Sequence, residues 1–184
     1  MRYPFEHIRV KHREDIPFIE EDFRKRRRGE ILHLTLSFIK TKEEVKKLPF
    51  YVRKAIFLSG EKPISWNLKE DFVKPLEKLF ALSEINLFFP APSENVKILR
   101  ERSFLSGIKA FRPDRVILYP EFVVVVDFKT HYPSEKEEET LEIYQNQVCD
   151  YMKIVSQVFK LPAQGYLLFI GPPKVEKIGE VKIK

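Results

Sequence analysis

Cysteine is almost absent from this chain of 184 residues, which has only Cys149. A single cysteine excludes a framework of disulfide bonds within the chain and a metal cluster held by four of its own cysteines. No run approaches the eighteen or so apolar residues that a membrane-spanning helix needs, and the charged first residues do not resemble a secretory signal. We therefore expect a cytoplasmic protein without a membrane partner.

The sequence also lacks a phosphate-binding loop and any internal repeat. The pattern Gly-x-x-x-x-Gly-Lys-Ser/Thr, which cradles nucleotide phosphates, does not occur. The chain therefore has no ATP-driven motor of its own. It is long enough for one domain with a proper core, and 43% of its residues are hydrophobic. We predict a single domain over residues 1–184, mainly helical over 1–83 and of α/β type over 84–184.

Positive charge is abundant. The net charge of +6 favours an anionic partner without identifying it. The residues up to Ile19 show no sustained period, and we expect them to form an arm. Five consecutive basic residues follow shortly after, and they form either a solvated face or a patch that contacts phosphates. These residues are Arg24, Lys25, Arg26, Arg27 and Arg28.

Residues 111–129 predict a β-hairpin, because two runs of Val, Ile, Leu and aromatic residues flank a Tyr-Pro-Glu break. With the turn centred on Pro120 and Glu121, the numbers of opposed residues sum to 241. Asp114 and Asp127 then become cross-strand partners, with Cβ atoms about 4.5–5.5 Å apart. Lys129 lies two residues beyond Asp127 and therefore on the same face.

Two adjacent carboxylates repel each other, so one of them is pushed toward its protonated form unless a cation lies between them. Mg²⁺ favours this kind of oxygen-rich site, with the rest of its coordination shell filled by water and phosphate. The cluster therefore suggests a metal-assisted hydrolase. The alternative is that Asp114 caps a strand, Asp127 ends one and Lys129 is a solvated charge, because clustered charges also occur in structural networks.

Residues 31–39 present two interpretations. Alternation of apolar and polar residues favours a half-buried strand, whereas a helix would be apolar on nearly every side, as in a buried helix. His33 lies within this segment. A histidine among apolar residues is usually structural, although histidine is also the commonest metal ligand.

The rest of the chain predicts helices and strands in an order typical of an α/β sheet covered by helices. A helical stripe after residue 137 places Gln147 and Tyr151 on one flank, four residues apart, where they are either ordinary core and edge residues or neighbours of a site. We predict helices over 41–58, from 67 to about 80 and from about 134 to 159, and strands over 96–104, 166–170 and 175–183.

Several short motifs resemble those of the PD-(D/E)XK nucleases, and within them the RecB-type nuclease domains of bacterial helicase-nucleases. Five matches occur in the order of that family between about residues 29 and 170, which is more specific than the short central motif alone. They are Gly29-Glu-Ile-Leu-His33, Arg100-Glu101, Pro113-Asp114, Asp127-Phe128-Lys129 and Gln147-Val-Cys-Asp-Tyr151.

This resemblance implies a restriction-endonuclease-like fold, a mixed β-sheet flanked by helices, with an N-terminal helical region that carries His33 on a helix. It also implies roles for individual residues. His33, Asp114 and Asp127 would bind a metal ion together with the Phe128 carbonyl, and Lys129 would orient the attacking water or offset charge on the phosphate. Glu101, Gln147 and Tyr151 would support the site or touch substrate.

The implied activity is hydrolysis of DNA that depends on Mg²⁺ or Mn²⁺. Its action would be exonuclease-like, on single strands or ends during repair or recombination. The implied partner is a helicase or recombination protein. With only Cys149, no iron–sulfur cluster is expected. An alternative is a catalytically silent module that binds nucleic acid or assembles with partners while keeping the fold. The cations expected to hold DNA phosphates are residues 24–28 with Arg100, Arg102, Arg112 and Arg115.

Overall fold

The computed structural model describes residues 16–134 and 137–182, and only the backbone of residues 16–20. The predicted N-terminal arm lies outside these residues up to position 15. From Ile16 the chain is helical rather than irregular, because it begins the long helix α1 (Ile16–Phe38).

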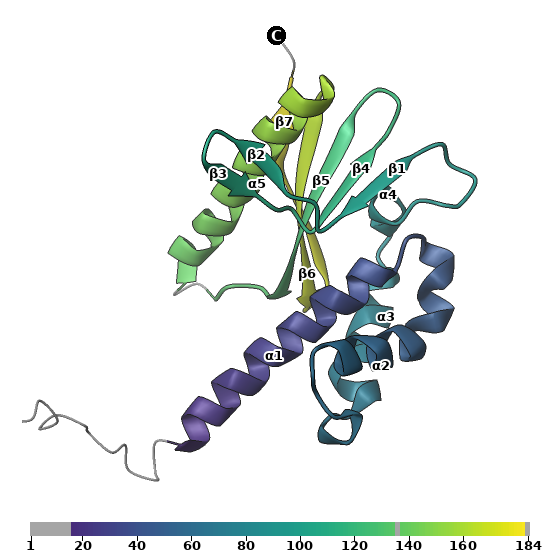
Figure 1. The fold of residues 1–184 in the computed structure, drawn as a ribbon, viewed down its shortest axis with the longest axis vertical. Helices are drawn as coiled ribbons and strands as arrows, with labels where there is room; N and C mark the ends of the chain where they lie inside the picture. Colours follow the sequence, from purple (N-terminus) through teal and green to yellow (C-terminus); the bar gives the residue numbers. More distant parts are fainter. Residues whose placement is uncertain (1–15, 135–136, 183–184) are drawn as a thin grey trace, which may run out of the picture.

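A five-stranded mixed sheet forms the centre of the molecule, with the strand order β1-β4-β5-β6-β7 (Figure 1). Neighbouring strands are antiparallel except β5 and β6, which are parallel and are connected through helix α5. A separate two-stranded hairpin is formed by β2 and β3. The strands are β1 (Lys97–Arg100), β2 (Phe104–Ser106), β3 (Lys109–Phe111), β4 (Arg115–Leu118), β5 (Val123–His131), β6 (Ala163–Gly171) and β7 (Lys174–Val181).

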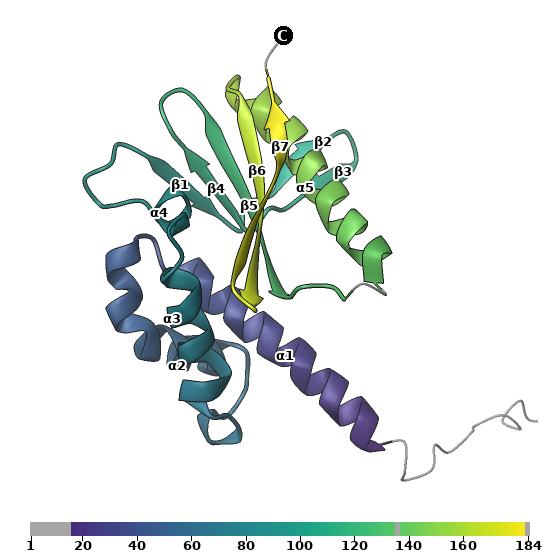
Figure 2. The same ribbon diagram turned by 180° about the vertical axis from the view of Figure 1, so that it is seen from behind.

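Helices cover both faces of this sheet. Helix α5 lies along one face, and the helices of the N-terminal part gather on the other, as the two opposite views show (Figure 2). The α/β class that the sequence predicted is therefore confirmed. Of the N-terminal part predicted to be helical, residues 16–83 are described, and most of them lie in helical segments. The helical segments after α1 are η2 (Lys42–Lys47), α2 (Leu48–Leu58), η3 (Pro63–Ser65), η4 (Leu68–Val73), α3 (Lys74–Phe80), α4 (Ile85–Phe88) and α5 (Glu138–Phe159).

Strand β5 shows how the sequence builds two cores. Because side chains alternate along a strand, Val124, Val126 and Phe128 point into the core of the N-terminal helices. Val123 and Val125 point the other way, into the core beneath α5. A strand buried on both faces is expected to be a continuous apolar run, as this one is. The alternation also places Asp127 and Lys129 on the α5 side of the sheet.

Residues 31–38 belong to α1, so the strand that their alternation favoured is wrong. The alternation misled because this helix is packed on several sides. Ile31, Leu32 and Leu36 are completely buried, and so is Thr35, whose hydroxyl donates to the Ile31 carbonyl at 2.8 Å. A helix surrounded by packing partners has no wide polar face to reveal its period. The helix that the family resemblance implied for His33 is confirmed.

The register of the central hairpin is confirmed. Arg115 pairs with Val126 and Leu118 with Val123, so opposed residues sum to 241, and the Tyr119 amide donates to the Phe122 carbonyl at 2.9 Å across the turn. The predicted strand over 96–104 is only partly correct. It breaks at Glu101, whose φ of 52° lies in the left-handed region.

The remaining predicted elements are present with shifted ends. The segment 41–58 divides into η2 and α2, and Pro49 lies in the first turn of α2, where it starts the helix instead of interrupting it. Asn67 caps the next helix by accepting from the Glu70 amide at 3.2 Å. The predicted C-terminal edge strand is β7. Within the described ranges, every helix is too short or too polar to cross a bilayer.

Candidate functional site

Asp114 occupies the open end of the central hairpin. It stands one residue before the first paired residue of β4, opposite Asp127 in the same register. Its Oδ2 atom accepts a hydrogen bond of 2.7 Å from the Phe128 amide on β5. A charge-assisted bond of this kind fixes the carboxylate beside the central strand.

Asp127 and Lys129 form a buried ion pair on the α5 side of β5. Lys129 Nζ lies 2.6 Å from Asp127 Oδ2, and Asp127 is only 4% exposed. The two atoms are close but not aligned as a hydrogen bond, and Oδ2 has no other hydrogen-bond partner among the described residues. Burial, followed by the negative charge of Asp114, raises the pKa of Asp127 to about 6. This carboxylate is therefore short of positive charge even with Lys129 beside it.

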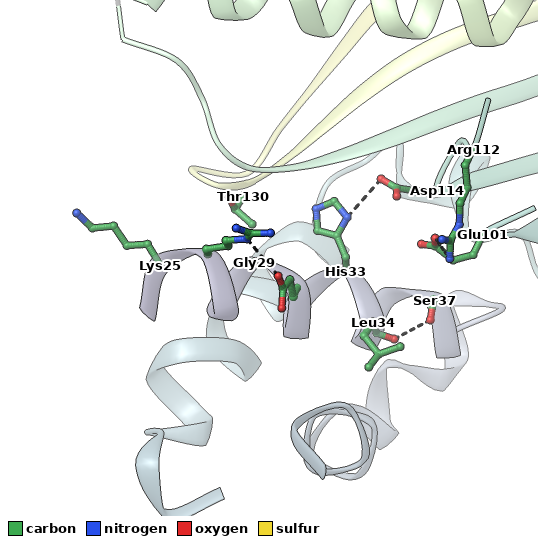
Figure 3. A pocket seen from close by; sticks show the side chains of 11 residues that line it. Lys25, Gly29, His33, Leu34, Ser37, Glu101, Arg112, Asp114 and Thr130 are labelled. Atoms are coloured by element: carbon green, nitrogen blue, oxygen red, sulfur yellow. Dashed lines mark hydrogen bonds and ion pairs between the residues drawn. The ribbon is translucent and has the colours of Figure 1, made fainter. Parts of the chain in front are cut away.

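His33 approaches the same cluster from α1. Its Nδ1 atom lies 3.4 Å from Asp114 Oδ2, and its ring meets the Phe128 ring edge to face with centroids 6.0 Å apart. Burial opposes protonation of His33, but the adjacent Asp114 outweighs it and raises the histidine pKa. Four residues earlier, Gly29 lets α1 lie close to β5, because a Cβ atom there would meet Thr130 Cγ2 at 3.2 Å. Figure 3 shows His33 pointing at Asp114.

Three residues of α5 complete the surroundings of Lys129. Its ammonium donates to Gln147 Oε1 at 3.1 Å, and Gln147 Nε2 donates to the Tyr151 hydroxyl at 2.7 Å. The ammonium also lies 4.1 Å from the centroid of the Tyr144 ring. Gln147 and Tyr151 thus adjoin the cluster, as the family resemblance implied. The contact of Tyr144 was missed, although its position three residues before Gln147 places it on the same side of the helix.

Glu101 lies at the edge of the site. Its amide donates to the Asp114 carbonyl at 3.1 Å, and its carboxylate lies 3.0 Å from the Arg112 guanidinium. Burial, followed by the negative charge of Asp114, raises the pKa of Glu101. The pairing with Arg112 had no signal in the sequence, because it depends on how β1 ends and β4 begins.

Not all of the predicted DNA-binding cations can contact DNA. Arg115 is 1% exposed and donates to the carbonyls of Ile39 and Lys40 at 2.9 and 2.7 Å, so its inclusion was wrong. Burial, with the nearby charge of Arg100, lowers the pKa of Arg115 to about 9. Arg100 is also turned inward, donating to the Ser37 and Phe38 carbonyls. Both residues tie the sheet to the end of α1.

The basic run on α1 divides between internal contacts and solvent. Arg28 donates to the Asp71 carbonyl at 2.9 Å, and Arg27 pairs with Glu30 and Glu61. Arg24 is exposed and stacks on Trp66 at 4.9 Å. Lys25 and Arg26 are exposed, with carboxylate partners on their own helix. Arg102 and Arg112, at the other end of the site, are exposed as well.

Two adjoining hollows connect this run with the acidic cluster. The first, of about 460 Å³, extends from Lys25 and Arg26 past His33 to Glu101 and Asp114 (Figure 3). The second, of about 430 Å³, shares Lys25, Arg26 and Thr130 with it and adds Arg28 and His131. Together they form a groove between α1 and the end of β5 that is basic at one end and acidic at the other.

The cluster offers the ligand types of a hard divalent cation without a ready-made cage. Across residues 16–134 and 137–182, no three His, Cys, Asp or Glu side chains converge closely enough to hold a metal ion. Asp127 instead directs Oδ2 at Lys129. A buried carboxylate oxygen without a satisfactory hydrogen bond, beside a second carboxylate, nevertheless fits a cation in electrostatic terms. His33, Asp114, Asp127 and the Phe128 carbonyl are the groups that can supply its ligands.

Comparison with known proteins identifies no relative, because no protein-family model matches the chain and no curated protein is significantly similar to it.

Proposed function

We propose that the chain is a metal-dependent nuclease that hydrolyses phosphodiester bonds of DNA. The observation that carries the proposal is the cluster of buried Asp127 with partly buried Asp114 and Lys129 at the open end of the hairpin, beside a groove with exposed cations. The buried carboxylate of Asp127 and the partly buried carboxylate of Asp114 raise each other's electrostatic energy, which does not help the chain to fold. In a site that binds a metal ion and a phosphate, both carboxylates can bind the metal ion.

The implied metal ion is Mg²⁺ or Mn²⁺, held by His33, Asp114, Asp127 and the Phe128 carbonyl. When bound, such an ion makes water nucleophilic at neutral pH and neutralises charge on the phosphate and the leaving oxygen. The Phe128 amide holds Asp114 in place through its 2.7 Å bond. Gln147 holds the Lys129 ammonium on the same face, where it can orient a water molecule or offset charge on the phosphate.

The groove supports DNA as the substrate. Lys25, Arg26 and Arg112 line it and can neutralise phosphates on the way to the site, which makes binding dependent on salt. Action on a single strand or a strand end, with exonuclease-like cleavage in repair or recombination, rests on the family resemblance. The sheet, with α5 crossing between the parallel strands β5 and β6, is compatible with a restriction-endonuclease-like fold. A helicase or recombination protein as partner rests on the resemblance alone.

The competing proposal is a silent nucleic-acid-binding module. It explains the cations equally well. The silent module does not account for the ion pair of Asp127 and Lys129 or for the raised pKa of Asp127. For this reason we favour the nuclease.

The test is cleavage of labelled single-stranded and double-stranded DNA by the purified chain with Mg²⁺, Mn²⁺ or EDTA. We expect cleavage with metal and none with EDTA, and we expect Asp114→Asn and Lys129→Gln to be inactive. Glu77→Gln, which changes an exposed carboxylate on α3, is the matched control and should cut normally. Metal-independent cleavage, or cleavage by Asp114→Asn equal to the parent, would contradict the proposal.

A further inference from the structure

The β2–β3 hairpin rises directly from the proposed active site. Glu101, three residues before β2, and Asp114, three residues after β3, are joined by the 3.1 Å hydrogen bond from the Glu101 amide to the Asp114 carbonyl. The twelve residues between them therefore form a finger whose base is closed at the site (Figure 1). A molecule that contacts the tip of this finger therefore lies at a defined distance from the acidic cluster at its base.

One face of the hairpin is anchored to α5. Phe104 packs against Phe159 and Phe111 against Tyr151, with ring centroids 6.0 and 6.5 Å apart. Lys109 Nζ lies 3.3 Å from Asp150. These contacts hold the finger in one direction relative to the site, and Tyr151 links it to the hydrogen bonds around Lys129.

The other face and the tip expose apolar side chains. Leu105 is 72% exposed, and Ile108, at the turn, is fully exposed at 107%. Gly107 has a φ of 58°, which gives the turn a left-handed residue that suits glycine. Ile108 remains in contact with water and packs against no other side chain among the described residues. Its side chain therefore contributes no hydrophobic burial to the stability of the fold.

The charge of the hairpin indicates the kind of partner that it contacts. Residues 102–113 include Arg102, Lys109 and Arg112 and no Asp or Glu. Lys109 is paired with Asp150 and Arg112 with Glu101, which leaves Arg102 without a carboxylate partner among the described residues. A cationic hairpin with an apolar tip suits a polyanion that offers flat apolar surfaces, and nucleic acid is such a molecule. Apolar side chains such as Ile and Leu insert at base steps in protein–DNA complexes and unstack them.

We propose that the β2–β3 hairpin is a wedge that contacts the last base pair of a DNA duplex, with Ile108 and Leu105 against the base pair and Arg102 and Arg112 against its phosphates. This inference rests on the proposed function, because the released single strand then enters the site at the base of the finger. Three paired residues at about 3.3 Å each span roughly 10 Å. Cleavage is therefore expected at a nearly constant distance from the junction between duplex and single strand.

The test uses the full chain in EDTA, so that binding is measured without cleavage. The probe is a DNA duplex with a single-stranded tail and a fluorescent base analogue in its last pair, and the comparison ligand is the tail alone. We expect parent protein to raise the fluorescence of the analogue by unstacking it. Ile108→Ser with Leu105→Ser should abolish that rise and weaken binding of the tailed duplex by about tenfold, with binding of the tail alone unchanged.

Ile64→Ser is the matched control, because Ile64 is 93% exposed in η3, within the helical part on the opposite side of the sheet from α5. It should leave both measurements unchanged. All of these positions are exposed, so circular dichroism should show intact folding. Equal loss of binding to both ligands, or no fluorescence rise with the parent protein, would overturn the wedge. Since cleavage is not part of the readout, the wedge and the nuclease can fail separately.

Discussion

Two buried charged side chains lie on neighbouring strands of this sheet, and they differ in the groups that surround them. Arg115 on β4 is 1% exposed and Asp127 on β5 is 4% exposed. The Arg115 guanidinium donates to two carbonyls at the end of α1 and stacks on the Phe89 ring at 4.1 Å. Asp127 has a poorly aligned contact with Lys129 and a second carboxylate nearby.

We interpret the difference as that between a structural charge and a charge that serves the proposed function. Two Arg115 nitrogens donate to fixed main-chain carbonyls, which helps a buried cation to be tolerated, whereas its Nε has no hydrogen-bond partner among the described residues. The surroundings of Asp127 leave its charge incompletely balanced, and this is the condition under which a ligand can supply the missing charge. Burial alone does not distinguish the two, but the identity of the partners does.

The largest expected effect is that of Asp127→Asn on cleavage. The substitution keeps the size of the side chain and removes its charge, so it should lower the cleavage rate by on the order of 10²–10³-fold. The free energy of unfolding should stay equal or rise, because the raised pKa of Asp127 means that the folded chain disfavours its charged form even with Lys129 2.6 Å away. Single-turnover cleavage and urea unfolding measure the two quantities. A variant that cuts normally, or that loses stability along with activity, would place Asp127 with Arg115 as a structural charge.

Arg115→Met should have the opposite profile. It leaves the Ile39 and Lys40 carbonyls buried without donors, so we expect the free energy of unfolding to fall by about 2–4 kcal/mol. Arg53→Met, at an exposed position of α2, is the control and should change it by less than about 0.5 kcal/mol. Urea unfolding of both variants provides the comparison, and a stable Arg115→Met would show that the carbonyls find other donors.

The pH dependence of stability should distinguish the two charges further. The pKa of Asp127 is raised to about 6 in the folded chain, so its folded form binds a proton more tightly than its unfolded form. This contribution to stability is present at low pH and is lost as pH rises through 6. In EDTA, the parent should therefore gain about 1–2 kcal/mol relative to Asp127→Asn between about pH 7.5 and pH 5. A difference that is constant or of opposite sign would contradict the raised pKa.

Local pattern predicted the fold and the hairpin register well, because they follow from alternation and turn chemistry. The numbers of opposed residues sum to 241 for every residue of β4 that pairs with β5. Pattern failed where tertiary packing decides. Residues 31–38 alternate like a strand and form a helix, and Arg115 resembles a DNA contact in sequence but faces inward. The proximity of Asp114 and Asp127 in the candidate site could be predicted from the hairpin register. The contact between Tyr144 and Lys129 could not, because it depends on how α5 crosses the sheet.

That contact provides the smallest and most specific prediction. The Tyr144 ring lies over the Lys129 ammonium at 4.1 Å and helps to hold it beside Asp127. A ring face of this kind contributes about 0.5–2 kcal/mol, so Tyr144→Leu should lower kcat by roughly threefold to tenfold with little change in KM. Tyr144→Phe keeps the ring and should retain parental kcat. If the Phe and Leu variants are equally impaired, the hydroxyl matters and the ring does not position Lys129. If only KM rises, Tyr144 contacts substrate instead. If only the Phe variant retains activity, the comparison with Arg115 extends further. An aromatic face would then hold both the buried Arg115 and the partly buried Lys129, and only Lys129 lies beside a carboxylate.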